Sequence, residues 1–379
     1  MGSNFSQLYL HNKKKVVVKG KAGHYSWETR NKVESDNSTI ADRVGTICGR
    51  LPGTINGQQF RIRNCKDVFI YVYNHVNTVT VDDCVNCTVV IGAVQTSLFI
   101  RDCEDCNVLA ACKQYRIRGC KNIASFVACG SEPIIESSSS IHFAPFQLFY
   151  PELIDQFKAA GLNPFNCSYS SVHDFTPKAT ASPNYDFFPT SEDIAKRILL
   201  PNDLASKFSL SSARENAELE PSELLDQLKA TRATLDPDLS IVPTVFAALL
   251  IDHARTTGDF ALIGLFYHSG VEDNARALIK TLLSQSVFLV RTRCAKYSPE
   301  DLTRIFGDST LAAHSRLGPI ISLQFHGPAR TVGDICQMAV DDLVRMKSIR
   351  PPTLLHVTQD SVTASRQAEM LVHFPLSRS

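Results

Sequence analysis

The sequence predicts a mixed fold, in which a parallel β-helix is followed by a small α+β domain of ferredoxin-like topology. Three observations predict it: a short motif that recurs every 17 to 19 residues, alternation of apolar and polar residues inside each copy, and a βαβ-α-β-α order near the C-terminus. A period of about 19 residues is too short for a helical pair and fits one coil of a β-helix. Alternation with period 2 is typical of a strand that has one buried face.

The repeated motif lies in residues 60–129, and each copy closes with a cysteine. A single copy cannot bury its apolar face alone, so the copies are expected to stack. Stacking gives two inward columns of large apolar residues and two outward columns that collect five arginines. The inward columns are Phe60, Val79, Leu98, Tyr115 and Ile62, Val81, Ile100, Ile117, and the outward columns are Arg61, Thr80, Phe99, Arg116 and Arg63, Asp82, Arg101, Arg118.

The cysteines of the repeat have the spacing of a zinc site. Cys84–Cys87 and Cys103–Cys106 match a C-x₂-C pair repeated after roughly 15–20 residues. In the flanking copies, however, Val68 and Ile123 hold the place of the second cysteine, and neither side chain can bind a metal. We therefore expect buried packing thiols and no metal site. Zinc is the alternative, and a metal assay separates the two.

Length and composition are those of an ordinary soluble protein. The chain has 379 residues, which predicts two or three domains, and it is 44% hydrophobic and 20% charged. The net charge of +1 predicts no general attraction to nucleic acid. No apolar run reaches the roughly 18–20 residues that span a bilayer, and no signal peptide opens the sequence. These observations favour a cytoplasmic protein with reduced cysteines.

The N-terminus carries an acylation motif. Residues 1–6 fit the N-myristoylation pattern, with Gly2 as the acceptor. One myristoyl chain binds membranes marginally, at about 10⁴ M⁻¹, so a basic cluster usually supplies a second signal. Lys13, Lys14 and Lys15 provide one here. We expect membrane anchoring, and the alternative is a chance match of a short motif.

Changes in composition and periodicity divide the chain into five segments. Helical and extended patterns alternate from residue 260, and Ser298 followed by Pro299 fits a helix N-cap and first position. The predicted segments are a basic acylated tail (1–23), the β-helix domain (24–178), a partly helical linker (179–259), the α+β domain (260–348) and a C-terminal tail (349–379).

Several motifs resemble the tubulin cofactor C domain family. They are the cysteine-rich copies together with Gly49–Gly53, Pro133–Ser139 and His173–Pro177. The resemblance implies a right-handed parallel β-helix that acts as a GTPase-activating protein for an ARF-like small GTPase in its GTP state, without a cofactor. It also implies a role at the cytoplasmic face of membranes, in or near a cilium or basal body, in the trafficking of lipidated proteins.

The resemblance also assigns site residues. Members of the family use a Gln-Gln-aromatic-Arg motif to supply an arginine finger, and the matching stretch is Lys113–Arg116. Arg116 would be the finger and Gln114 its neighbour, while Lys113 replaces the first glutamine. On residue pattern alone, Arg116 is one of five solvated arginines on an outer face. The family positions at the GTPase contact surface correspond to Arg118, Glu136 and Phe175.

The C-terminal unit resembles a nucleoside diphosphate kinase fold at Gly318–Leu323. No lysine follows the first strand, His268 lies where no phosphohistidine is expected, and His314 lacks the Gly-Ser context of the kinase nucleophile. We therefore expect a structural or docking domain without kinase activity. Two other functions remain open for the whole chain. It could bind an ARF-like GTPase as a non-catalytic effector, which Lys113 favours, or it could assist tubulin folding, which the acylation motif argues against.

Overall fold

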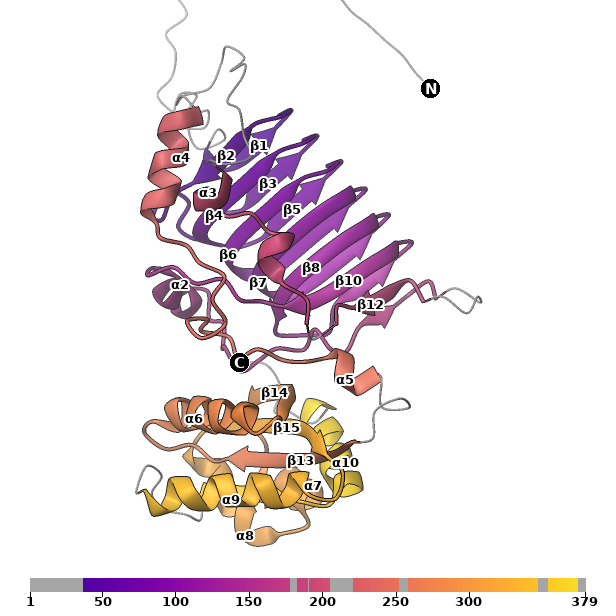
Figure 1. Ribbon diagram of the computed structural model, residues 1–379, viewed down its shortest axis with the longest axis vertical. Coiled ribbons are helices and arrows are strands. Elements are labelled where there is room, and N and C mark those ends of the chain that lie inside the picture. The colour runs from indigo at the N-terminus through magenta and orange to yellow at the C-terminus, as the bar shows by residue number, and fades with distance from the viewer. Residues whose placement is uncertain are drawn as a thin grey trace, which may run out of the picture. The chain divides into compact units, whose positions relative to one another are not determined.

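The computed structural model describes residues 37–177, 183–189, 191–204, 221–251, 258–346 and 354–373. Within them the chain forms a parallel β-helix and, after it, a four-stranded antiparallel sheet with helices (Figure 1). The predicted acylation site Gly2 and the lysines Lys13, Lys14 and Lys15 lie outside the described residues.

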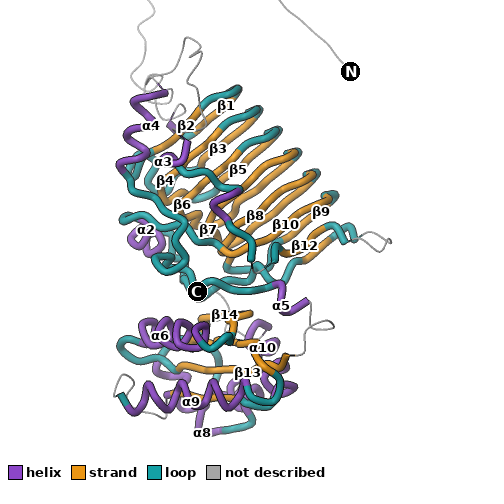
Figure 2. Tube along the Cα trace, viewed as in Figure 1, coloured by secondary structure: helices purple, strands orange, loops and turns teal. Residues whose placement is uncertain are grey.

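The parallel strands of the β-helix belong to one 12-stranded sheet that covers two faces, here called the first and the second sheet, and the strands of the two faces alternate along the chain (Figure 2). The first sheet contains β1 (Thr39–Ala41), β3 (Phe60–Arg63), β5 (Val79–Asp82), the C-terminal parts of β6 (Thr88–Arg101) and β7 (Glu104–Arg118), β9 (Ile134–Glu136) and β11 (His173–Asp174). The second contains β2 (Ile47–Arg50), β4 (Phe69–Val76), the N-terminal parts of β6 and β7, β8 (Lys121–Cys129), β10 (Ser139–Pro145) and β12 (Tyr185–Phe187).

The predicted columns are confirmed by the strand register. Phe60 pairs with Val79, Val79 with Leu98, and Leu98 with Tyr115, and each of these side chains is at most 1% exposed. The outward neighbours alternate with them along each strand. The repeat also extends further than its cysteines indicate, because β1, β9 and β11 add rungs to the same sheet.

Each rung turns at a corner where the backbone is left-handed. The residue before the closing cysteine has φ of 50° at Asn64, 53° at Asp83 and 52° at Asp102. Asn and Asp adopt this region more readily than other residues with a side chain. In the next copy Gly119 takes the position at φ 66°, and a Cβ there would collide with Oδ1 of Asp102. The repeated Asx-Cys and Gly-Cys pairs are therefore turn signals.

A second corner follows each cysteine by two residues and forms a ladder of amide and carboxylate groups. Asn86 Nδ2 donates to Asp67 Oδ1 at 2.7 Å, and Asn122 Nδ2 donates to Asp105 Oδ1 at 2.6 Å. All four residues have φ between 51° and 57°. The ladder ties successive turns together at the solvent-exposed edge of the stack.

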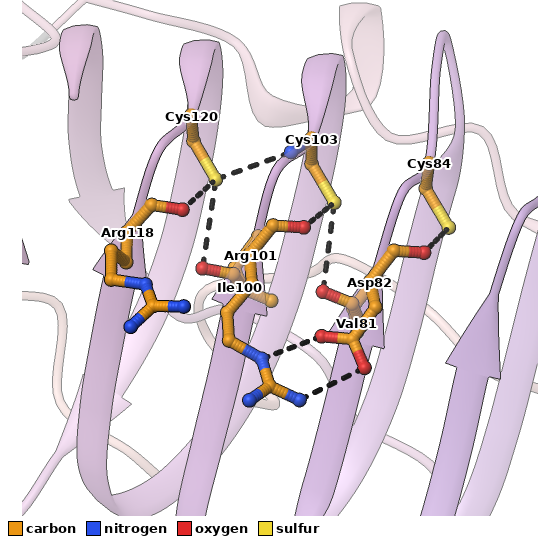
Figure 3. Close-up of polar contacts among 8 residues, drawn as sticks. All are labelled: Val81, Asp82, Cys84, Ile100, Arg101, Cys103, Arg118 and Cys120. Carbon is orange, nitrogen blue, oxygen red and sulfur yellow. Dashed lines mark hydrogen bonds and ion pairs between the residues drawn. The ribbon is translucent and has the colours of Figure 1, made fainter. Parts of the chain in front are cut away.

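The cysteines pack at these corners and donate to backbone carbonyls. Cys84 Sγ lies 3.3 Å from Asp82 O, Cys103 Sγ 3.2 Å from Arg101 O, and Cys120 Sγ 3.3 Å from Arg118 O (Figure 3). The predicted packing column is confirmed, because Val68, Cys87, Cys106 and Ile123 are all at most 2% exposed. Within the described ranges, no group of three or more His, Cys, Asp or Glu residues could hold a metal ion.

The first rung is closed by an arginine. On one side β1 pairs with β3, where Arg61 N donates to Ser38 O. The carbonyls of Asn37 and Thr39 therefore point away from β3. Arg50 Nε donates to Asn37 O at 2.9 Å and Arg50 Nη2 to Thr39 O at 3.1 Å. Its Cζ also lies 5.8 Å from the ring centroid of Phe60, the first aromatic residue of the inner column.

The segment predicted as a linker packs along the β-helix where it is described. It contains α3 (Pro201–Leu204), α4 (Pro221–Ala230) and α5 (Ala248–Ile251). Leu228 and Val245 are fully buried, and Tyr71 Oη donates to Leu199 O at 2.6 Å. These residues thus belong to the core of the β-helix. Their apolar residues are too irregularly spaced to show a helical or strand period, which is why the sequence suggested a linker.

The C-terminal unit is a ferredoxin-like layer, as predicted. Its sheet has the order β14-β15-β13-β16, and all neighbours are antiparallel. Ser298 caps α7, accepting a hydrogen bond from Asp301 N at 3.0 Å. The residues predicted as a tail complete this unit with its fourth strand and last helix. The elements are β13 (Gly258–Leu265), α6 (Val271–Ser284), β14 (Phe288–Ala295), α7 (Pro299–Phe306), α8 (Ser309–Ala312), β15 (Ile320–Pro328), α9 (Val332–Arg345), β16 (Leu355–Thr358) and α10 (Ser361–His373).

Candidate functional site

The candidate site is the outer face of the first sheet, around β7, β9 and β11. Arg118 on β7 is in register with Glu136 on β9. Phe175 follows β11, and its N–H donates to Ile135 O at 2.9 Å. Since β9 lies between β7 and β11, the three residues that the resemblance places at a contact surface come from neighbouring rungs.

These side chains point into solvent. Arg116, Arg118 and Glu136 are exposed, and Phe175 is 61% exposed. The Phe175 ring packs edge-on against His173 at 4.6 Å between centroids. Aromatic residues and arginine are enriched at protein interfaces relative to the rest of the surface, and this surface exposes Phe175 with Arg116 and Arg118.

Arg116 is held by two neutral groups. Its Nη2 donates to Gln114 Oε1 at 3.2 Å, and its Cζ lies 5.9 Å from the ring centroid of Phe99. Ser97 Oγ donates to the same Gln114 oxygen at 3.1 Å. Ser97 and Phe99 are the register partners of Gln114 and Arg116 on the adjacent strand β6. The structure therefore brings the side chains of Gln114 and Arg116 into contact.

The neighbouring Arg101 is bound differently. Its Nε and Nη2 donate to the two oxygens of Asp82 at 2.7 and 3.0 Å (Figure 3). The hydrogen bond with Asp82 raises the pKa of the Arg101 guanidinium above its ordinary value. By contrast, no carboxylate among the described residues forms an ion pair with Arg116 or Arg118. The charge of these two arginines is thus available to a partner.

Lys113 is directed away from this group. Its Nζ lies 3.8 Å from the point where a Cβ on Gly161 would stand, just after α2 (Leu153–Ala159). Its carbonyl oxygen accepts from the N–H and the hydroxyl of Ser131, both at 3.0 Å. A cation is favourable near the carbonyl end of a helix. In this conformation the amine of Lys113 lies near Gly161, just past the end of α2, and not beside Gln114 or Arg116.

His268 and His314, two histidines of the C-terminal unit, lie against other groups. His268 Nδ1 lies 2.9 Å from Phe266 O, and its Nε2 lies 2.8 Å from Asn274 Nδ2. The His314 ring lies 5.2 Å from the Phe266 ring. Both ring nitrogens of His268 therefore have partners, an arrangement that suits a structural residue better than a free nucleophile.

The repeat predicts that Phe99 lies in the same outward column as Arg116, but it assigns Phe99 no role and does not distinguish Ser97 from its neighbours. The signal was present in the repeat, because aligning the copies sets Phe99 beside Arg116. What the alignment does not contain is the direction of the Gln114 amide and of the Arg116 guanidinium. Those directions depend on side-chain contacts across the strands.

Comparison with known proteins defines the class. The sequence profile of the family described as Tubulin binding cofactor C matches residues 57–175, which contain Lys113–Arg116, Arg118, Glu136 and Phe175. The chain therefore carries a tubulin cofactor C domain on its β-helix.

The full-length comparisons are more specific. Protein XRP2 of Homo sapiens is 33% identical over 352 residues, which are 92% of this chain and 91% of that protein. Protein XRP2 of Gallus gallus is 32% identical over 93% of this chain and 90% of that protein. The chain belongs to the Protein XRP2 family. The Tubulin-specific chaperone C of Homo sapiens is also similar, at 34% identity, over 35% of this chain and 38% of that protein.

Proposed function

We propose that this chain is a GTPase-activating protein for an ARF-like small GTPase in its GTP state, and that Arg116 is its arginine finger. One observation carries the proposal. Arg116 projects from a rigid strand, is oriented by Gln114, and has no carboxylate partner among the described residues. Membership of the Protein XRP2 family and the match of Gln114–Arg116 to the last three positions of the finger motif support the same assignment.

The chemistry follows from the charge that develops during GTP hydrolysis. Negative charge spreads over the γ-phosphate oxygens in the transition state, and an arginine delivered in trans stabilises it. The guanidinium offers a planar donor fork that is always charged. Such a finger is worth roughly 10³–10⁵ in rate, or about 4–7 kcal/mol. A side chain on a stacked strand is positioned more tightly than one on a loop, as this gain requires.

The surface around the finger would receive the GTPase. Arg118 supplies a second free cation, Glu136 an anion on the next rung, and Phe175 an exposed ring. Charges of both signs around an apolar anchor favour one orientation of the partner over others. In this proposal the β-helix holds the finger at a fixed distance from the contact residues.

We further propose that the protein works at the cytoplasmic face of a membrane, in or near a cilium. The support is the acylation motif at Gly2 and the basic residues Lys13, Lys14 and Lys15, since a single acyl chain needs such a second signal. No described helix is long and apolar enough to cross a bilayer. The C-terminal unit is assigned a docking or structural role without phosphoryl transfer, supported by the engaged ring of His268.

A single-turnover GTP hydrolysis assay tests the proposal. An ARF-like GTPase loaded with GTP is mixed with the full-length chain, and phosphate release is compared with that of the GTPase alone. Acceleration by several orders of magnitude is expected. Tight binding without acceleration would instead identify a non-catalytic effector, the function that the direction of Lys113 favours. Absence of binding, together with an effect on tubulin folding, would favour the activity that the name Tubulin-specific chaperone C gives its similar relative.

A further inference from the structure

The contacts of Arg116 differ in kind from those of Arg101, although the two occupy comparable places. Each arginine has a register partner on the preceding strand of the same sheet: Phe99 for Arg116 and Asp82 for Arg101. Asp82 forms a bidentate ion pair with Arg101, while Phe99 offers the face of a ring to Arg116. Both guanidinium groups are positively charged, but the same backbone arrangement balances the charge of Arg101 with a carboxylate and leaves that of Arg116 without a counter-charge among the described residues.

Uncharged side chains can orient a guanidinium group without compensating its positive charge. The Phe99 ring attracts the cation through its quadrupole. Gln114 accepts one N–H with an oxygen that Ser97 also binds, and two donors on one oxygen fix which way the amide points. Ser97, Gln114 and Phe99 thus limit the conformations of Arg116 on the free protein. An arginine that is already ordered loses less side-chain entropy when it enters the GTPase site.

We propose that Phe99 is a positioning residue for the arginine finger, and that Ser97 supports it by acting through Gln114. We also propose that the side chain at position 99 must be uncharged for Arg116 to accelerate GTP hydrolysis. This inference rests on the proposed GTPase activation. Phe99 orders the guanidinium before the GTPase binds and leaves its positive charge for the γ-phosphate. A carboxylate at the same position would order Arg116 as firmly but would compensate its positive charge, as Asp82 does for Arg101.

Substitutions at Phe99 can test separately how the orientation and the positive charge of Arg116 affect the rate of GTP hydrolysis. Phe99→Leu removes the ring and should lower the saturating single-turnover rate roughly two- to fivefold, the equivalent of one exposed cation–π contact. Phe99→Tyr should retain the wild-type rate. Phe99→Asp should lower it on the order of tenfold to a hundredfold, because the new carboxylate pairs with Arg116 and repels the γ-phosphate. Affinity for the GTPase should change much less than the rate.

A matched control exists one rung earlier in the same column. Thr80 pairs with Arg61 on one side and with Phe99 on the other. Thr80→Asp adds the same charge to the same face, but beside Arg61 instead of Arg116. It should leave the saturating rate close to that of the wild type, which distinguishes a local ion pair from a general change in surface charge.

The experiment measures the GTP hydrolysis rate at saturating activator and, separately, the dissociation constant of each full-length variant. Thermal unfolding checks that every variant folds, and if Phe99→Asp does not, the pair Phe99→Leu and Phe99→Tyr decides. If the wild type accelerates hydrolysis while Phe99→Leu and Phe99→Asp match it, the positioning role is overturned and the proposed function stands. Loss of affinity with an unchanged saturating rate overturns it too, because Phe99 would then be a contact residue. A wild-type protein without acceleration overturns the proposed function, and the inference with it.

Discussion

Replacing Arg116 by alanine tests the proposed chemistry most directly, because the structure separates what the side chain does for stability from what it offers a partner. The side chain is exposed and makes one hydrogen bond, to Gln114, and one cation–π contact, with Phe99. Loss of both contacts should change the free energy of unfolding by no more than about 0.5–1 kcal/mol. Binding of the GTPase should weaken by less than about tenfold, since Arg118, Glu136 and Phe175 remain.

The effect on hydrolysis should be much larger. The activated single-turnover rate is expected to fall by roughly 10³–10⁵, to near the intrinsic rate of the GTPase. Arg116→Lys keeps the charge but lacks the planar fork, so it should recover little of the activity. The assay follows phosphate release from GTPase loaded with GTP, at activator concentrations above the measured dissociation constant of each variant.

Arg61→Ala provides the matched control. Arg61 is exposed, belongs to the same outward column, and is separated from Arg116 by Thr80 and Phe99. Its removal should leave the saturating rate intact. If Arg116→Ala accelerated hydrolysis as the wild type does, the finger assignment would be refuted. If both variants lost activity equally, the surface would act through its summed charge and no single arginine would be the finger.

Three further predictions concern the scaffold and the anchor. Gly92→Ala should lower the free energy of unfolding in urea by about 1–3 kcal/mol, because the new Cβ would clash with Tyr150 Oη and lie 2.9 Å from Gln156 Oε1. Gly130→Ala is the control and should be tolerated, because the nearest atom to its new Cβ is 3.6 Å away. Burial raises the pKa of the Cys167 thiol from 9.0 to about 12. Between those pH values the thiol ionises in the unfolded chain alone, so stability should fall with pH by about 1.4 kcal/mol per unit for this group, and the alkaline slope should be shallower in Cys167→Ala. Gly2→Ala should abolish association with anionic vesicles after co-expression with an acyltransferase; undiminished association would exclude acylation as the anchor.

Much of the β-helix follows from the sequence because its information is local and repeated. The alternation around Ile62, Val81, Ile100 and Ile117 fixes which face is buried, and the Asx-Cys pairs mark the turns. The same regularity showed that the cysteine spacing belongs to a packing column, since Val68 and Ile123 share it. Rungs such as the one that contains β9 have no closing cysteine to mark the turn, and they were not predicted from the sequence.

Features that depend on contacts distant in sequence could not be predicted. Leu228 packs on the β-helix because Gly49 leaves room for it, with Leu228 carbon atoms 3.0 Å from where a Cβ would stand. Nothing near Leu228 in the chain encodes that partner. At the site, the resemblance identifies Lys113–Arg116 as a motif, but the sequence does not show that Lys113 turns toward Gly161 while Arg116 lies over Phe99. Rotamers are chosen by neighbours on other rungs, which the linear pattern does not specify.

Arg50 at the first rung bears on how the protein behaves at high concentration. A stack of parallel strands can in principle add a strand from another molecule, because its terminal strand presents unpaired carbonyl and amide groups. Arg50 occupies the carbonyls of Asn37 and Thr39 with donors of its charged guanidinium group. Arg50→Ala should free these acceptors, and sedimentation velocity should then detect concentration-dependent end-to-end oligomers. Among the described residues, Arg50 would thus be a group that limits the β-helix to the length of one chain.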